Sequence, residues 1–449
     1  MRLKIAGGRL FDPASGRRGE AGDLYLEGER LVPPLDEVDE VLEAHGQAVL
    51  AAGVELCAPM AGFGGHLLHL RGEALPPTDT GKLYARLGYT HVHVGGLTFA
   101  TAAAVHRQLS ALTLVDTSAS LEVNLREVDL ALQDPARLPE VVETLRLLQA
   151  RTRTLGFSVA EPFVRYRQDY YAHRTVPGPR ALEILAALAA GLGCRLFLEA
   201  SPELLSWPFP EPARFHLSGL SRGLVGEAEA EAARGLLAAG ATGDLGLSLA
   251  GPAGPPVYVE LGGYAPRCLT ARPGAVEVAR ALTLALDFPG QGLAFSSLGP
   301  LSRLEQDFPR FLACLGKPEQ CPLPLGEAAG SRCWTILDWA YATRFLPAEL
   351  LGLSDRGRLT PGARADIALY DLPPEGGLGS LSRCRTLIKA GRVVIRDYVL
   401  VDPDVPRQTL FRNPPAAETP LFQELSRAYS FRPETLGALE KLGGPWAEV

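Results

Sequence analysis

Short strand-like segments alternate with longer helix-like segments through the middle of this chain, and this alternation constrains the fold more than any other feature. Residues 91–94 and 195–198 have the apolar character of buried strands. Residues 139–148 carry apolar side chains at a three-residue spacing, which is typical of a helix with one buried face. The Ala- and Leu-rich segments 180–192 and 227–239 also read as helices.

Repeated strand–helix–strand units predict a parallel sheet with right-handed crossovers. Over roughly 280 residues a (β/α)8 barrel fits best. A doubly wound parallel sheet would give a similar pattern, so the alternation alone leaves that alternative open.

The two ends of the chain contain short strand-like pieces instead. Gly and Pro interrupt these pieces in residues 1–50 and again in residues 365–395, which predicts a small β-domain built from both termini. The expected organisation is therefore an N-terminal part of a β-sandwich, a barrel, the C-terminal part of the sandwich, and a tail with a short helix: 1–52, 53–345, 346–415 and 416–449.

The composition excludes several classes of protein. The chain has 44 Lys and Arg residues and 51 Asp and Glu residues, which gives a net charge of −7. No basic excess therefore exists to neutralise nucleic-acid phosphates. No apolar run approaches the roughly 20 residues of a membrane helix, and the apolar run at the N-terminus is too short for a signal peptide. We therefore expect a cytoplasmic protein. Seven scattered cysteines argue against a disulfide framework and against a structural zinc site.

Three segments of the chain resemble one family. Residues 79–90, with the run Tyr-Ala-Arg-Leu-Gly-Tyr-Thr, and residues 306–315, with Phe-Pro-Arg, resemble the A subunit of formylmethanofuran dehydrogenase. Residues 342–371 are similar to the segment that leads from barrel to β-domain in many amidohydrolases. The same family includes the A subunit of the bacterial formyltransferase/hydrolase complex.

The resemblance, which spans about residues 1–415, implies a fold, a chemistry and partners. It implies an amidohydrolase-type (β/α)8 TIM barrel with a small β-sandwich domain. Family members carry a binuclear zinc centre and hydrolyse or form the formyl amide of a furan-type carrier. They act in tetrahydromethanopterin-linked one-carbon metabolism, within a multisubunit complex.

The position of the first metal ligands departs from the family. Those enzymes place a His-x-His pair at the end of the first barrel strand, and here the pair falls on Cys57 and Pro59. Proline has no donor atom for a metal. Hydrolysis of an unactivated amide needs a metal-bound water of lowered pKa, so these substitutions bear directly on activity.

The other ligand positions also lack the metal-binding residues of the family. The bridging lysine falls near Ser158, no histidine occurs in residues 195–200, and the strand-end aspartate falls on Leu298. Only His216 keeps a histidine in a region where the family has several. The sequence therefore predicts that the binuclear site, and with it the zinc cofactor, is absent.

Other residues provide alternative sites. His91 and His93 share one face of a predicted strand and could form a relocated metal pair or pack as core residues. Glu161, Glu199 and His216 are the candidates to complete such a pocket. Cys57 could act as a nucleophile, although no histidine lies beside it in the sequence, and the alternative is a buried small residue.

These observations lead to one function and two alternatives. The first is a degenerate, non-metal scaffold or assembly component of a formyltransferase/hydrolase-type complex, which could still bind a methanofuran-like formyl carrier. The second is an active formyl-amide hydrolase with rearranged metal ligands. The third is a regulatory or small-molecule-binding protein unconnected with the complex. None of them involves nucleic acid or a membrane.

Overall fold

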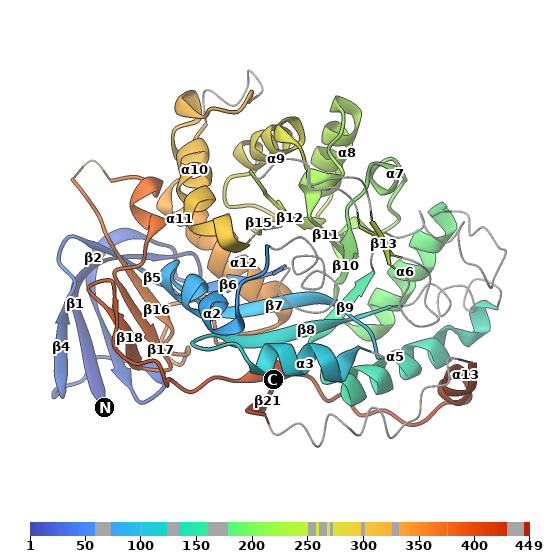
Figure 1. The fold of residues 1–449 in the computed structure, drawn as a ribbon, viewed down its shortest axis with the longest axis horizontal. Helices are drawn as coiled ribbons and strands as arrows, with labels where there is room; N and C mark the ends of the chain where they lie inside the picture. Colours follow the sequence, from blue (N-terminus) through green and yellow to red (C-terminus); the bar gives the residue numbers. More distant parts are fainter. Residues whose placement is uncertain are drawn as a thin grey trace.

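The computed structural model describes residues 1–58, 73–99, 101–123, 134–159, 178–249, 257–259, 267–269, 273–297, 301–325, 332–374, 376–428 and 444–449. Within them, a curled parallel sheet surrounded by helices stands beside a second sheet formed by the two chain ends (Figure 1).

The parallel sheet has the strand order expected of a (β/α)8 barrel. Consecutive strands pair in parallel from β6 to β12 and then to β15. The strands are β6 (Gly53–Glu55), β7 (Tyr89–Leu97), β8 (Asp116–Glu122), β9 (Gly156–Val159), β10 (Leu196–Glu199), β11 (Phe215–Ser218), β12 (Thr242–Asp244) and β15 (Leu293–Ala294). The barrel-type fold predicted from the alternation is therefore confirmed.

Helices follow the strands along the chain and lie on the outside of the sheet (Figure 1). They are α2 (Pro77–Arg86), α3 (Ala102–Ser110), α5 (Leu138–Thr152), α6 (Gly178–Leu192), α7 (Pro202–Leu205), α8 (Glu227–Ala238), α9 (Ala275–Asp287) and α10 (Leu304–Gly316). In α5 the side chains Val142, Leu145 and Leu148, which have the predicted three-residue spacing, are all buried. The helix ends at Thr152, and the left-handed φ of 51° at Arg153 stops the helical pattern.

A continuous helical segment leads from the barrel to the second sheet. It consists of α11 (Ile336–Ala340), a π-helical turn (Tyr341–Phe345) and α12 (Leu346–Leu351). Thr335 caps its start, since its side chain accepts from the Asp338 N–H while the Asp338 carboxylate accepts from the Thr335 N–H. Gly352 ends it in the left-handed conformation.

Both chain ends build the second sheet, as the sequence predicts. Its order is β19-β18-β17-β16-β5-β1-β2-β3, with β4 also paired to β1. Antiparallel pairing of β5 with β16 joins the two ends. The strands are β1 (Arg2–Asp12), β2 (Arg17–Glu27), β3 (Arg30–Val32), β4 (Glu40–Glu43), β5 (Gln47–Ala51), β16 (Ile367–Asp371), β17 (Thr386–Lys389), β18 (Arg392–Arg396) and β19 (Val399–Leu400). Leu3, Ile5 and Ile388 belong to its separate apolar core.

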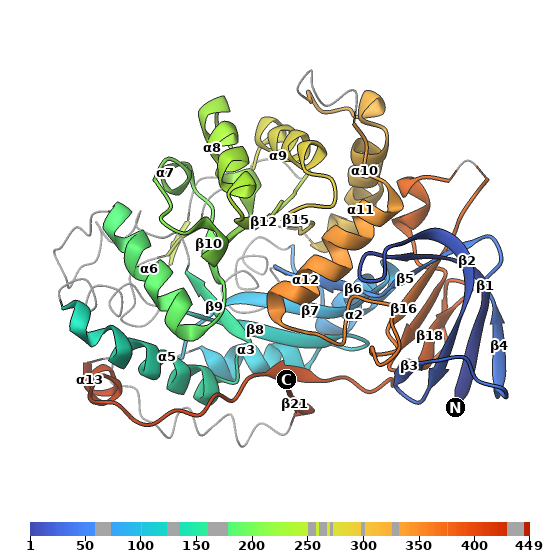
Figure 2. The same cartoon turned by 180° about the vertical axis from the view of Figure 1, so that it is seen from behind.

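The C-terminal segment returns to the barrel. Strand β20 (Thr409–Phe411) pairs in parallel with β8, and β21 (Trp446–Glu448) pairs with β20. Between them, α13 (Pro420–Ala428) packs on α5 (Figure 2). Residues 409–411, which we expected in the small domain, thus extend the barrel sheet, and the domain boundaries themselves stay a prediction.

Two smaller features lie outside the two main sheets. Strands β13 (Val257–Val259) and β14 (Arg267–Leu269) form a separate antiparallel pair. Cys314 and Cys321 form a disulfide, which the scattered cysteine spacing did not predict, because the fold at the end of α10 brings their Cα atoms to 4.5 Å.

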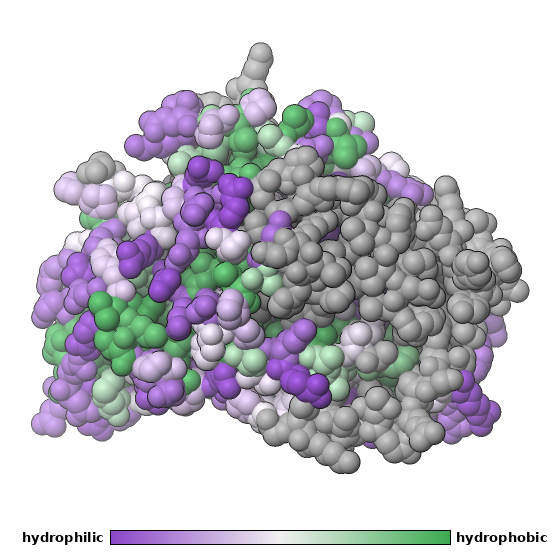
Figure 3. Space-filling model, in the orientation of Figure 1, coloured by the Kyte–Doolittle hydropathy of each residue, from purple (hydrophilic) through white to green (hydrophobic). Residues whose placement is uncertain are grey.

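The described residues contain no helix that is long and apolar enough to cross a membrane. Hydrophilic and apolar side chains are interspersed over the described part of the face in Figure 3.

Candidate functional site

The carboxyl-terminal ends of the barrel strands form the face where barrel enzymes place their active sites. Cys57 follows β6 at this end, and its backbone N–H donates to Oε1 of Glu55 at 3.2 Å. Burial, reinforced by the nearby Asp244 carboxylate, raises the pKa of the Cys57 thiol well above its usual range. The thiol is therefore protonated at neutral pH and does not suit the role of a nucleophile.

Three predicted site positions lie outside the described residues: Pro59, Glu161 and Leu298. Two of them, the proline and the leucine, have side chains without nitrogen, oxygen or sulfur that could bind a metal. They can therefore supply no side-chain ligand, whatever their placement.

Ser158, at the bridging-lysine position, holds strand ends together. Its hydroxyl accepts a hydrogen bond from the backbone N–H of Gly96 at 3.2 Å, which links β9 to β7. Glu199, at the end of β10, pairs with Arg222 just beyond β11. Their side chains are 23% and 22% exposed, so this ion pair is partly accessible at the barrel end.

His91 and His93 face the barrel interior and are held by serines of the next strand. Ser118 Oγ lies 2.8 Å from Nε2 of His91 and 2.8 Å from Nδ1 of His93. Ser120 Oγ lies 2.8 Å from Nε2 of His93. One hydroxyl has one proton, so Ser118 donates to one imidazole and accepts from the other.

Both imidazoles are neutral. Burial lowers the pKa of His93 to about 3 and that of His91 well below its usual value. Both ring nitrogens of His93 have protein partners, so a metal could bind it only by displacing a serine. The register of β7 with β8 therefore favours a structural role for His91 and His93 in the core over metal binding.

His216 lies in the same interior but does not complete a ligand set with His93. Its Nδ1 lies 3.0 Å from Thr242 Oγ1 and its Nε2 lies 3.1 Å from Oδ2 of Asp244. The Phe197 ring packs against both imidazoles, with its centroid 4.6 Å from that of His216 and 6.2 Å from that of His93.

Asp244, at the end of β12, is a buried residue that the sequence reasoning missed. Its Oδ1 accepts from the Gly219 N–H at 3.1 Å and from the Ser296 hydroxyl. Ser296 Oγ in turn accepts from the Gly246 N–H at 2.9 Å. The only signal in the sequence is a carboxylate at the end of a short strand-like run after a predicted helix.

Glu55 is a second buried carboxyl group at this end. Burial raises the pKa of Glu55 to about 8, although the backbone N–H groups of Cys57 and Leu56 act against the rise. Asp244 raises it further. At neutral pH the Glu55 side chain is therefore mostly an uncharged acid.

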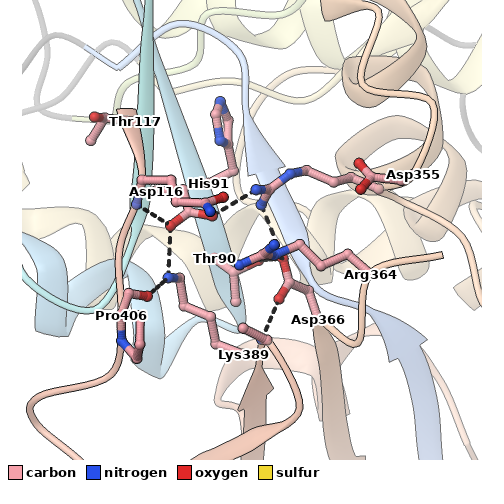
Figure 4. Close-up of polar contacts among 12 residues, drawn as sticks. Thr90, His91, Asp116, Thr117, Asp355, Arg364, Asp366, Lys389 and Pro406 are labelled. Carbon is pink, nitrogen blue, oxygen red and sulfur yellow. Dashed lines mark hydrogen bonds and ion pairs between the residues drawn. The ribbon is translucent and has the colours of Figure 1, made fainter. Parts of the chain in front are cut away.

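A network of buried ion pairs lies at the opposite, amino-terminal ends of β7 and β8 (Figure 4). Asp116 binds Nη2 of Arg356 and Nζ of Lys389, each at 2.7 Å. Arg356 also reaches Asp366 at 3.0 Å. Burial alone would raise the pKa of Asp116, but Arg356 and Lys389 outweigh it and hold that pKa well below its usual range.

This network joins the two sheets, because Asp116 begins β8 whereas Lys389 ends β17. Asp366 precedes β16 and accepts from the Ala390 N–H at 2.7 Å and from the Thr90 hydroxyl at 3.3 Å. The network lies away from the carboxyl-terminal strand ends, where barrel enzymes place their active sites, and this position indicates a structural role.

The described residues do not fit a binuclear metal centre. Among them, no three His, Cys, Asp or Glu side chains are grouped so that they could hold a metal ion. The ligand positions that lie within the described ranges carry a neutral thiol and a serine hydroxyl, while His216 is already bonded on both nitrogens. The loss of the binuclear site remains a prediction, which metal analysis of the purified protein tests.

Comparison with known proteins identifies the relationship. No family model matches the chain. The A subunit of the formyltransferase/hydrolase complex of Methylorubrum extorquens is 24% identical over 511 residues, which covers 89% of each protein. The crystal structure of that complex with methylofuran matches at a TM-score of 0.83 and 21% identity, over 100% of this chain and 99% of the other. The chain is an amidohydrolase-fold relative of this A subunit.

Other amidohydrolase folds match less closely. A triazine hydrolase from Arthrobacter aurescens matches at a TM-score of 0.53 and 14% identity, over 96% of this chain and all of the other. Atrazine chlorohydrolase from the same species, in complex with zinc, also scores 0.53, at 15% identity over 90% and 97% of the two chains. The resemblance to the A subunit, like the barrel fold inferred from the sequence, is confirmed.

Proposed function

We propose that this chain is an A-subunit-like component of a formyltransferase/hydrolase-type complex of one-carbon metabolism, located in the cytoplasm. In that complex it serves as a scaffold or assembly component and not as a metal-dependent hydrolase. The observation that carries the proposal is a complete A-subunit-type fold around an interior in which both ring nitrogens of His93 and of His216 bond to neighbouring side chains. Fold and site are separable, because packing determines the first and a few side chains the second.

The extent of the likeness supports membership of a complex. It covers 100% of this chain and 99% of the relative at a TM-score of 0.83, against 0.53 for the triazine hydrolase. We propose that a chain with the whole outline of such a component occupies the same place in a complex. The proposed partners are therefore the other subunits of a formyltransferase/hydrolase complex.

The side-chain contacts support the loss of hydrolase activity. Hydrolysis by this fold needs donor atoms that are free to bind metals. Here Ser118 and Ser120 engage His93, while Asp244 and Thr242 engage His216. A hydrolase with rearranged ligands on His93 and His216 would have to break these contacts, whereas Nδ1 of His91 has no hydrogen-bond partner among the described residues.

A partly exposed ion pair marks the end of the barrel where we propose that a carrier binds. Glu199 and Arg222 form a partly exposed ion pair there, next to Cys57. A furan-type formyl carrier is the ligand we propose for this end, since the related complex was solved with methylofuran. Binding without turnover would suit a component that holds or guides the carrier.

Co-expression with the remaining subunits of such a complex tests the proposal. We expect the chain to co-elute with them in size-exclusion chromatography, and we expect the purified chain to lack turnover of the formyl carrier. Elution of the chain alone would contradict membership of the complex. Stoichiometric zinc together with turnover would instead support the rearranged hydrolase, and loss of both in His93→Ala would identify its ligand.

A further inference from the structure

A closed hydrogen-bond network lies at the carboxyl-terminal ends of the last barrel strands. We call it the Asp244 network: the side chains of Asp244, His216 and Ser296 with the backbone N–H groups of Gly219 and Gly246. The three side chains are fully buried. They come from β11, from β12 and from the residues directly after β15.

Each member of the network has a defined partner. Asp244 accepts from the Ser296 hydroxyl and the Gly219 N–H on one oxygen and contacts Nε2 of His216 on the other. Ser296 accepts from Gly246. A buried carboxylate is tolerated only when donors surround it in this way.

Two contacts hold the His216 ring in place. Its Nε2 lies 3.1 Å from Oδ2 of Asp244 and its Nδ1 lies 3.0 Å from Oγ1 of Thr242, both on β12. Thr242 is itself fixed, because its hydroxyl accepts from Nη1 of Arg195 at 3.1 Å and donates to the Phe215 carbonyl at 3.5 Å.

We infer that the Asp244 network fulfils the structural task of a metal centre in this barrel: it ties the ends of β11, β12 and β15 together and occupies the side-chain donors of Asp244, His216 and Ser296. Asp244 is then a positioning residue that holds the His216 ring through Nε2. The inference rests on the proposed loss of the metal site. It adds that the fold of the barrel end is independent of metal.

The experiment combines thermal unfolding with nitrogen NMR of the histidines. For the wild-type chain we expect the same unfolding midpoint and the same His216 signal with chelator, without additive and with added zinc. Asp244→Asn should lower the midpoint and change the His216 signal. Asp116→Asn is the matched control, since it removes an equally buried carboxylate: it should lower the midpoint and leave the His216 signal unchanged.

Ser296→Ala covers the case in which Asp244→Asn does not fold. It removes one donor to Asp244, so we expect a lower midpoint and a shifted His216 signal. A wild-type midpoint that falls with chelator, or rises with zinc, would overturn the inference. So would a His216 signal that neither variant changes. Failure to co-elute with partner subunits would contradict only the proposed function, so the two failures are distinguishable.

Discussion

Nζ of Lys389 lies 2.7 Å from Oδ1 of Asp116, and both side chains are fully buried. Lys389 ends a strand of the sheet built from the chain termini, whereas Asp116 begins a barrel strand. A charge pair of this kind holds two sheets in one arrangement, because separating them would leave charges buried without a partner.

Replacing Lys389 should therefore weaken the whole fold. We expect Lys389→Met to lower the free energy of unfolding by about 3–5 kcal/mol, since the buried Asp116 carboxylate would lose one of its positively charged partners. Lys4→Met is the control, because Lys4 makes an equally short contact with Asp23 at the surface. That change should cost about 0–1 kcal/mol. Urea unfolding of the two variants checks the difference, and equal losses would contradict the role of burial.

The buried histidines predict lower stability in acid. Burial lowers the pKa of His93 to about 3 and that of His106 to about 4, against 6.5 in the unfolded chain. Below pH 6.5 the unfolded chain binds protons that the folded chain does not, so stability falls as the pH falls. Each histidine contributes a slope of about 1.4 kcal/mol per pH unit.

His93→Gln should remove one of these contributions. We expect a shallower loss of stability between pH 6.5 and 4 than in the wild type, measured by urea unfolding at several pH values. His45→Gln, at an exposed position, is the control and should leave the slope unchanged. A wild-type stability that does not change over this range would contradict the neutral, buried state.

Glu55 predicts the opposite slope. Burial raises the pKa of Glu55 from 4.5 to about 8, so between these values the folded chain keeps a proton that the unfolded chain has lost. Stability from this group therefore falls as the pH rises through that range. In urea unfolding at several pH values, Glu55→Gln should remove this loss and gain relative to wild type as the pH rises, whereas the exposed Glu43→Gln should not.

Two helical glycines predict different tolerance to alanine. A Cβ at Gly81 in α2 would lie 2.0 Å from the carbonyl oxygen of Thr113, so the backbone would have to move. We expect Gly81→Ala to cost about 1–3 kcal/mol or more. Gly235 in α8 has open space at the same point, so Gly235→Ala should gain about 0.5–1 kcal/mol. Thermal unfolding compares the two.

The elements that the sequence predicted are those whose signal is local. The spacing of Val142, Leu145 and Leu148 predicts α5 whatever the helix packs against. Strand β20 spans only Thr409–Phe411, and its partner β8 lies far away in the sequence, so no local pattern could reveal the pairing.

The candidate site was predictable only in part. The sequence identified His91, His93 and His216, but their serine, threonine and aspartate partners come from neighbouring strands whose register the sequence does not give. Asp244 was missed for the same reason, since only the fold brings Ser296 and His216 beside its carboxylate. The disulfide between Cys314 and Cys321 depends on the local path of the chain after α10.

The proposed loss of the metal site is tested most sharply by the metal content of the chain, purified in complex with its partner subunits and without added metal or chelator. Elemental analysis by mass spectrometry, normalised to the chain concentration, is the measurement. We expect zinc and other transition metals to stay far below one ion per chain. One or two tightly held metal ions per chain would show that the barrel keeps a working metal site and would refute the proposal.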